Sequence, residues 1–444
     1  MLLHGTLGNI GNILNFVSIT FEVDIKNFVT TTNGTYNKTS IKEDVDSYVF
    51  STFSLSSILG QLFICLLYGK LVNRYGSSFL WINIRLYTVI VAFSQFLFGI
   101  SCFFILPQLV FLAECPSFYG GASVILNTNT AYMFINVIVT TLISKSSLIN
   151  YHNWHYIFII GIFISIIYLL LTHEVKETPK YLYFVDSNLE KINESLLFYR
   201  HKDTNIDKVI NRYDKEIDMY KKKVFMSISK VFNTKSLRKR IFLLFLVEIS
   251  QIISVYTIIS PYLEKMLNYL NFPLLYTSSI IFGLQLGGLA ASMISAVVSE
   301  LFSRKKLLIA FIIFSSISFK FMFVGLIYQE INTVNIISQI LCVFSIYLSA
   351  IISNIGHMCF TPILINDMIP IHAKFSTIQI MTIFSSMIQI FLIIFFVPLY
   401  NVLGSVTFLN YNIFPTIAMF LIIKYLPNTK NKQVYEIFND YEQL

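Results

Sequence analysis

Long apolar stretches separated by short polar breaks are the feature that most constrains the fold of this chain. Only 13% of its 444 residues are charged and 55% are hydrophobic. A soluble chain is typically about 25% charged. A stretch of about 20 apolar residues is long enough to cross a bilayer as a helix. The pattern therefore predicts an all-α membrane protein, with its five cysteines inside the apolar stretches rather than in a disulfide framework.

The apolar stretches form two groups of six on either side of a polar stretch. The predicted spans lie near 4–21, 47–68, 79–96, 98–115, 121–144, 155–172, 240–263, 275–298, 307–327, 334–358, 375–400 and 403–425. The third and fourth are the weakest, because about 37 residues between Ser78 and Cys115 are few for two crossings. We expect an N-terminal half (1–172), a central loop with short helices (173–239), a C-terminal half (240–427) and a tail (428–444).

Loop charges predict the orientation in the membrane. The segment 174–240 holds 16 Lys and Arg against 10 Asp and Glu, a net charge of +6. Cytoplasmic loops carry an excess of basic residues, so we expect this loop and both termini in the cytoplasm. The predicted first outer loop carries two glycosylation sequons, at Asn33 and Asn37. The basic runs favour contact with an anionic membrane surface over nucleic acid.

Short charged signatures recur at the predicted inner ends of the spans. They include GKLVNRYGSS (69–78), AECPS (113–117), KETPK (176–180), SELFSRKKLL (299–308) and NDMIP (366–370). The signatures after spans two and eight occupy equivalent positions in the two halves of the chain. The signatures after spans four and ten do so as well. A duplication of this kind is typical of transporters built from two repeats that rock against each other.

These motifs resemble those of the sugar porter family of the major facilitator superfamily, over nearly the whole chain. HEVKETPKYL resembles the family's P-E-S-P-R-[WYF]-L, and LPNTKNKQVYEIF resembles its terminal P-E-T-K-G motif. NDMIPIHAK resembles E-[IL]-x-P-x-x-x-R, and NRYGSS resembles D-R-x-G-R-R. The chain departs from the family at Asn73, Ser77 and Ser78, which replace an acid and two arginines. This weakens the expected first-half charge network.

The resemblance implies a major facilitator fold of about twelve spans and a gate of acid–base pairs at the inner ends. The residues expected in this gate are Arg74, Glu114, Glu177, Lys180, Glu300, Arg304, Lys305, Asp367 and Lys374. The alternative is that they are ordinary interfacial charges that end helices.

The resemblance also places a substrate site in the middle of the membrane. Neutral polar side chains there would suit a hexose or a similar small polar solute. The candidates are Asn127, Thr128, Gln251, Ser254, Gln285 and Thr361. Each could instead form an ordinary hydrogen bond between helices.

Two positions, Asn9 in span one and Glu248 in span seven, bear on whether transport is coupled to protons. Family members that couple to protons resemble one another in an Asp of the first span, whereas this chain has Asn9 in LGNIGNILNF. Facilitated diffusion is therefore expected, since a proton carrier must titrate. Glu248 is either a functional acid within span seven or an interfacial partner of Arg238 or Arg240.

No enzyme signature, cofactor fingerprint or metal-ligand spacing is present in the sequence. We therefore expect a monomeric plasma-membrane transporter whose partners are a small solute and the lipid bilayer. The alternatives are a transporter of another small organic solute, or a solute sensor that does not transport. The sensor is less favoured, because only 17 residues follow Pro427.

Overall fold

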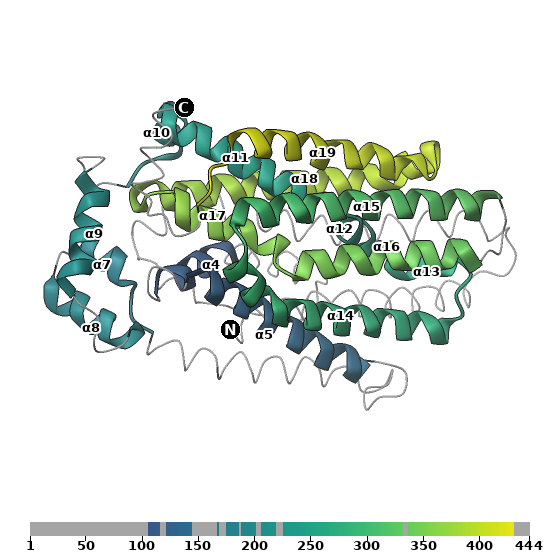
Figure 1. Ribbon diagram of the computed structural model, residues 1–444, viewed down its shortest axis with the longest axis horizontal. Helices are drawn as coiled ribbons and strands as arrows, with labels where there is room; N and C mark the ends of the chain where they lie inside the picture. The colour runs from purple at the N-terminus through teal and green to yellow at the C-terminus, as the bar shows by residue number, and fades with distance from the viewer. Residues whose placement is uncertain are drawn as a thin grey trace, which may run out of the picture.

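The structure is a computed structural model that describes residues 105–115, 121–143, 167, 175–185, 188–200, 206–218, 225–331 and 336–429. The predicted first, second, third and sixth spans lie outside these residues, except for Ile167. Arg74, Asn33 and Asn37 also lie outside them. Long helices run side by side along one axis, and short helices lie at one end of this bundle (Figure 1). We call this end, where α7, α8 and α9 lie, the loop end.

Six helices in the described residues are long and apolar enough to cross a membrane. A seventh is counted if a bent pair, Lys235–Ile252 with Val255–Tyr269, forms one span. The described N-terminal helices are α4 (Ile105–Glu114), which is only ten residues long, and α5 (Gly121–Ile143), which is one of the six. The other long helices are α11 (Lys235–Ile252), α14 (Leu274–Leu301), α15 (Arg304–Ile331), α16 (Ile336–Asn354), α18 (Ile371–Leu403) and α19 (Val406–Tyr425).

Two of the spans are interrupted. After α11 the chain bends by 59°, then continues through α12 (Val255–Ile259), η2 (Ser260–Tyr262) and α13 (Leu263–Tyr269). After α16, Gly356 takes a φ of +133°, and η3 (His357–Cys359) leads into α17 (Phe360–Met368). The predicted tenth span therefore ended ten residues too early, at 358 instead of Met368. The chain returns to a helix after the glycine, which supplies a backbone angle that other residues rarely adopt.

The loop end carries four short helices: α7 (Pro179–Val185), α8 (Leu189–Tyr199), α9 (Ile206–Asp218) and α10 (Ile228–Asn233). Asn188 caps α8, since its side chain accepts hydrogen bonds from the backbone of Glu190 and Lys191. Ile192 and Leu196 of α8 pack against Val209 of α9, which gives these helices a small apolar core of their own.

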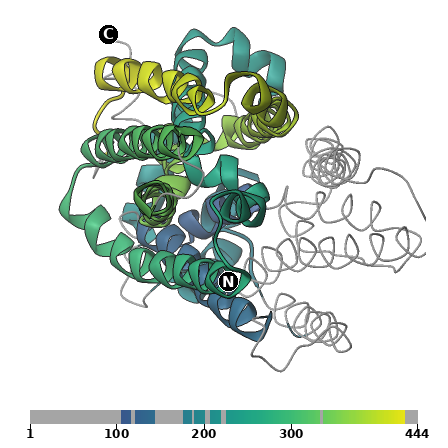
Figure 2. The same ribbon diagram turned by 90° about the vertical axis from the view of Figure 1, so that its right-hand side faces the viewer.

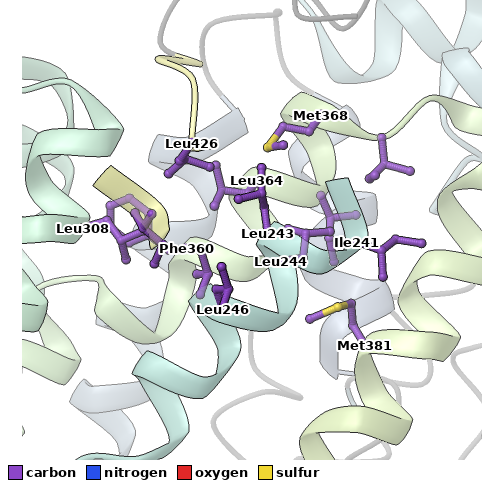
Figure 3. Close-up of a cluster of buried hydrophobic side chains, with 14 of the residues drawn as sticks. Ile241, Leu243, Leu244, Leu246, Leu308, Phe360, Leu364, Met368, Met381 and Leu426 are labelled. Carbon is purple, nitrogen blue, oxygen red and sulfur yellow. The ribbon is translucent and has the colours of Figure 1, made fainter. Parts of the chain in front are cut away.

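The main apolar core lies where α11 meets α15, α17, α18 and α19. In Figure 3, Ile241, Leu243 and Leu244 of α11 lie among side chains from the neighbouring helices. Figure 2 shows the described long helices end-on, packed beside one another. This core fixes the position of α11 and α17, which carry the polar residues described next.

Candidate functional site

A buried ion pair links the N-terminal and C-terminal helices at the loop end. Glu114 is the last residue of α4, and Lys374 lies in the first turn of α18. The Lys374 Nζ lies 2.5 Å from Glu114 Oε1 and 3.1 Å from Asn366 Oδ1. Thr178 donates a hydrogen bond of 3.2 Å to the other Glu114 oxygen. The Lys374 and Glu114 side chains are only 3% and 10% exposed, so solvent screens this pair weakly.

Lys180 of α7 pairs with a residue that sequence reasoning missed, Glu216 of α9. Their charged atoms lie 2.7 Å apart. The second Glu216 oxygen accepts a hydrogen bond of 3.1 Å from the backbone N–H of Ile371, at the start of α18. Glu216 therefore ties the loop helices to a helix N-terminus, where negative charge is favoured.

The two pKa shifts agree with a stable pair. Burial alone would lower the pKa of Lys180, but the nearby Glu216 and Glu114 carboxylates outweigh burial, and the pKa is raised. Burial alone would raise the pKa of Glu216, but Lys180, Lys374 and the Ile371 N–H outweigh burial, and the pKa is lowered. Both groups are therefore held in their charged forms.

The sequence did contain a signal for Glu216. Ile206, Val209, Tyr213 and Glu216 follow one another at intervals of three and four residues along α9. This spacing places them on one helix face. Val209 is 7% exposed and Glu216 only 6%. An acid on the apolar face of an amphipathic helix is expected to have a buried partner.

The other predicted gating residues have different surroundings. Arg304, the first residue of α15, forms an ion pair with Asp367 of α17. Glu300 of α14 accepts a hydrogen bond of 3.2 Å from Ser123 of α5. Glu177 is half-buried, and its backbone carbonyl accepts a hydrogen bond from Ser195. For Lys305, no ion pair is formed within the described residues.

A second polar cluster lies on α11 and α17, beside both helix interruptions. The Thr361 Oγ1 is 2.5 Å from Glu248 Oε2 and 2.9 Å from Gln251 Oε1. Ser385 of α18 also interacts with the Glu248 carboxylate. Glu248 is therefore an acid within span seven. It is not a partner of Arg240, which hydrogen-bonds the Met368 carbonyl 2.5 Å away.

Nearby polar groups hold the interruption after α11. Ser254 caps α12: its hydroxyl accepts a hydrogen bond of 3.3 Å from the Thr257 N–H. The Ser349 hydroxyl of α16 accepts another, of 2.9 Å, from the Tyr256 N–H. The Tyr256 side chain interacts with Gln285 of α14 and is close to Tyr132 of α5.

The polar residues of α5 differ in their surroundings. Asn127 is exposed, and so are Phe134 and Ile138 on the same face of α5. Thr128 is buried and donates a hydrogen bond to the Val124 carbonyl, within its own helix. The neighbouring Asn129 instead reaches the Asn354 carbonyl of α16, at 3.0 Å. Asn129, Tyr132 and Asn136, at intervals of three and four, are the signal that could have identified this face.

Chemically, the cluster offers amide, hydroxyl and carboxylate groups to a polar solute, and the ion pairs join helices at one end of the bundle. No group of three or more potential metal ligands occurs in the part of the chain that the structure describes. Such an arrangement, between interrupted membrane helices, defines a solute transporter rather than an enzyme.

Comparison with known proteins agrees with this class. Residues 120–441 match the family described as "Sugar (and other) transporter", and the chain belongs to this family. No curated protein sequence matches it.

Solved structures share its all-helical major facilitator fold. The chain is 14% identical to the proton:xylose symporter XylE bound to 6-bromo-6-deoxy-D-glucose, with a TM-score of 0.72 over 99% of this chain and 98% of that one. The partially occluded inward-open form of the E. coli xylose transporter XylE gives 14% identity and a TM-score of 0.63, over 98% of each chain. The inward-open form of the same transporter gives 14% sequence identity and a TM-score of 0.58, over 98% of each chain.

Proposed function

We propose that this protein moves a hexose or a similar small neutral polar solute across a membrane by alternating access. The observation that carries the proposal is the cluster of Gln251, Thr361 and Glu248 between two interrupted spans. Sugar hydroxyl groups need both donors and acceptors, and interrupted spans are where transporters place such groups. Family membership supports a sugar as the substrate.

The proposed solute contacts come from both parts of the bundle. Gln251, Thr361 and Gln285 contribute from the C-terminal helices. Asn129 takes the place of Asn127, because it points towards α16 and Asn127 is exposed. Ser254 and Thr128 have local backbone partners, which favours structural roles for both hydroxyl groups.

The ion pairs at the loop end support a gate that is closed there. Lys374 and Glu114 hold α18 against α4, and the solute site can then open only towards the other end. The basic loop sequence supports a cytoplasmic loop end, with both termini cytoplasmic in the plasma membrane.

Uptake into proteoliposomes tests this proposal. Purified protein should carry labelled glucose or xylose in preference to amino acids, carboxylates or organic cations. Gln251→Ala should weaken the apparent affinity for the sugar by roughly tenfold, which is the usual cost of a lost buried hydrogen bond. Ser260→Ala is the matched control, since Ser260 is exposed on the same broken span. A protein that carries no sugar of the panel contradicts the proposal.

A second candidate is a small organic cation on the same fold. Glu248 favours it, because a carboxylate within a span can pair with a positively charged solute. Labelled cations in the same panel separate the two candidates. Uptake of a cation that is abolished by Glu248→Gln, together with no sugar uptake, would replace the hexose with a cation.

A further inference from the structure

Two acceptors in the cluster, on Glu248 and Gln251, compete for the single hydrogen atom of the Thr361 hydroxyl. The Thr361 hydroxyl lies within hydrogen-bond distance of two oxygens, Glu248 Oε2 at 2.5 Å and Gln251 Oε1 at 2.9 Å. A hydroxyl group has a single hydrogen, while an ionised carboxylate and an amide carbonyl only accept. With Glu248 ionised, Thr361 can therefore satisfy only one of the two contacts.

One added proton on Glu248 resolves the conflict. The carboxylic acid then donates to Thr361 Oγ1, and the Thr361 hydroxyl donates to Gln251 Oε1. This protonated form requires the Gln251 amide to turn its Oε1 towards Thr361, which is the orientation in the structure. If Glu248 is ionised, Thr361 must donate to Glu248, and the Gln251 amide must turn so that its Nε2 donates to Thr361.

A second observation points to a ligand beside this chain of hydrogen bonds. Gln251 is only 3% exposed, and its Nε2 has no hydrogen-bond partner within the described part of the chain. A buried donor of this kind is costly unless something accepts from it. Because the amide turns with the protonation of Glu248, Gln251 offers a donor in one form and an acceptor in the other.

We propose that Glu248, Thr361 and Gln251 form a proton-linked binding site, in which a proton on Glu248 sets Gln251 to donate to a solute hydroxyl oxygen. The proton comes from water, binds one Glu248 oxygen, and returns to water when the solute leaves. This rests on the proposed transport function and deepens it. It also supplies, in span seven, the titrating acid that the sequence lacks in span one.

Other charged groups near α11 have partners of their own. Asp367 of α17 pairs with Arg304, Lys374 of α18 pairs with Glu114, and Arg240 hydrogen-bonds the Met368 carbonyl. His357 of η3 contacts Ser250, at 3.4 Å. On α19, Tyr411 is buried in a separate apolar cluster, and Lys424 is exposed. Glu248 therefore faces hydroxyl and amide groups in the described residues, and His357 is the neighbour whose titration must be separated from it.

The first measurement is sugar binding to the purified protein in weakly buffered detergent solution, with glucose and xylose as probes. Binding should take up a proton, seen with a pH indicator. The apparent affinity should rise as the pH falls, by up to tenfold per pH unit where Glu248 titrates. Sugar binding that neither takes up a proton nor changes with pH would overturn the proposal and leave the proposed transport function intact.

Variants of Glu248 and Thr361 test whether the two residues link sugar binding to a proton or have only a structural role. In Glu248→Gln and in Thr361→Val, the affinity should no longer depend on pH, and Thr361→Ser should restore the dependence. Glu330→Gln is the matched control, because Glu330 is a carboxylate that caps the start of α19 far from the cluster. His357→Gln should keep the pH dependence. If His357→Gln abolishes it and Glu248→Gln does not, the proton site is His357 and the proposal fails.

An infrared titration tests the proton site without any solute. The carbonyl stretch of a protonated carboxyl group should appear as the pH falls and be missing in Glu248→Gln. Thr361→Val should shift this band, since it removes the hydrogen bond to the acid. If no such band appears at any pH at which the protein stays folded, the proposal is overturned, even if no sugar of the panel binds.

Discussion

Lys374 and Glu114 form an ion pair that is almost completely buried. The pair joins two helices that lie far apart in the sequence. Removing one partner leaves a charge without its counterion in a site that water reaches poorly, at a typical cost of about 3–5 kcal/mol. Glu114→Gln should therefore shift the protein away from the state that is closed at the loop end. A cysteine at Ile378, which lines the small cavity beside this pair, reports the shift.

The measurement is the rate at which a membrane-impermeant maleimide labels Ile378→Cys from the loop end. Labelling should accelerate at least several-fold in Glu114→Gln, and the exchanged pair Glu114→Lys with Lys374→Glu should restore slow labelling. Lys176 and Glu194 supply the control, because their side chains are 43% and 67% exposed and their ion pair joins the residues before α7 to α8, within the loop segment. Glu194→Gln should leave labelling unchanged. Equal rates in all variants would mean that the buried pair does not hold the gate.

The ion pair of Lys180 and Glu216 should make folding stability depend on pH. The pKa of Glu216 is lowered, so its contribution is present above the ordinary value of about 4.3 and is lost as the pH falls through the folded-state value. The pKa of Lys180 is raised, so its contribution is present below about 10.4 and is lost as the pH rises through the folded-state value. Between these limits, Glu216→Gln should lower the midpoint of thermal unfolding. The difference from the wild type should shrink below about pH 4, and a difference that is constant with pH contradicts the assignment.

Residues that form ion pairs were predictable where they belong to a sequence motif. They were not predictable where only the tertiary packing determines the partner. Glu114, Lys180 and Lys374 were identified from acid–base signatures at span ends, and all three lie in ion pairs. Their gating role remains a prediction. Glu216 carries no such motif, because it is selected by the docking of α9. The contact of Asn129 with α16 was not predicted either, because adjacent residues in one helix point in directions about 100° apart.

At the scale of elements, Gly356 is the position at which the tenth span breaks. Its φ is +133°, and a Cβ there would lie 2.9 Å from Cδ2 of Leu126 in α5. Gly356→Ala should therefore destabilise the protein by about 1–3 kcal/mol, the usual range for backbone strain. Thermal unfolding in detergent measures this.

Gly287 is the matched control for this substitution. It lies inside α14, and a Cβ there would meet no atom nearer than Ile351 Cγ1, at 4.0 Å. Gly287→Ala should leave stability unchanged or raise it by about 0.5–1 kcal/mol, because alanine favours a helix interior. If the two variants unfold at the same temperature, the break does not depend on the glycine conformation.

In the described residues, the helices long and apolar enough to cross a membrane were predictable, whereas the breaks within two of the spans were not. Hydropathy reports only how apolar a segment is, and both pieces of each broken span are apolar. The sequence around Ile253 has no glycine or proline to mark the bend, since Ser254 and Ser349 satisfy the freed backbone groups there. Gly356 is one of 17 glycines, and nothing local distinguishes it from the glycines of α14.

For the whole molecule, the central question is whether the loop end opens and closes. Helices α5 and α14 lie along each other and join the N-terminal to the C-terminal helices. Thr130 of α5 hydrogen-bonds the Ser292 carbonyl of α14, and Gly288 packs so closely that a Cβ would meet Met133 Cε at 2.5 Å. Near the loop end, Ser123 of α5 donates to Glu300 of α14. Alternating access requires some of these contacts to separate in each cycle.

A short cross-linker between cysteines at Ser123 and Glu300 should therefore trap the protein closed at the loop end. The doubly substituted protein should cross-link efficiently, because the two side chains are already in contact at 3.2 Å. Sugar uptake should stop after cross-linking and recover when a cleavable linker is reduced. The control pair, Lys176→Cys with Glu194→Cys, should cross-link equally well without stopping uptake, since both residues belong to the loop segment. Uptake that continues at full rate through the Ser123–Glu300 cross-link would show that α5 and α14 need not separate there, and that transport does not proceed by rocking at the loop end.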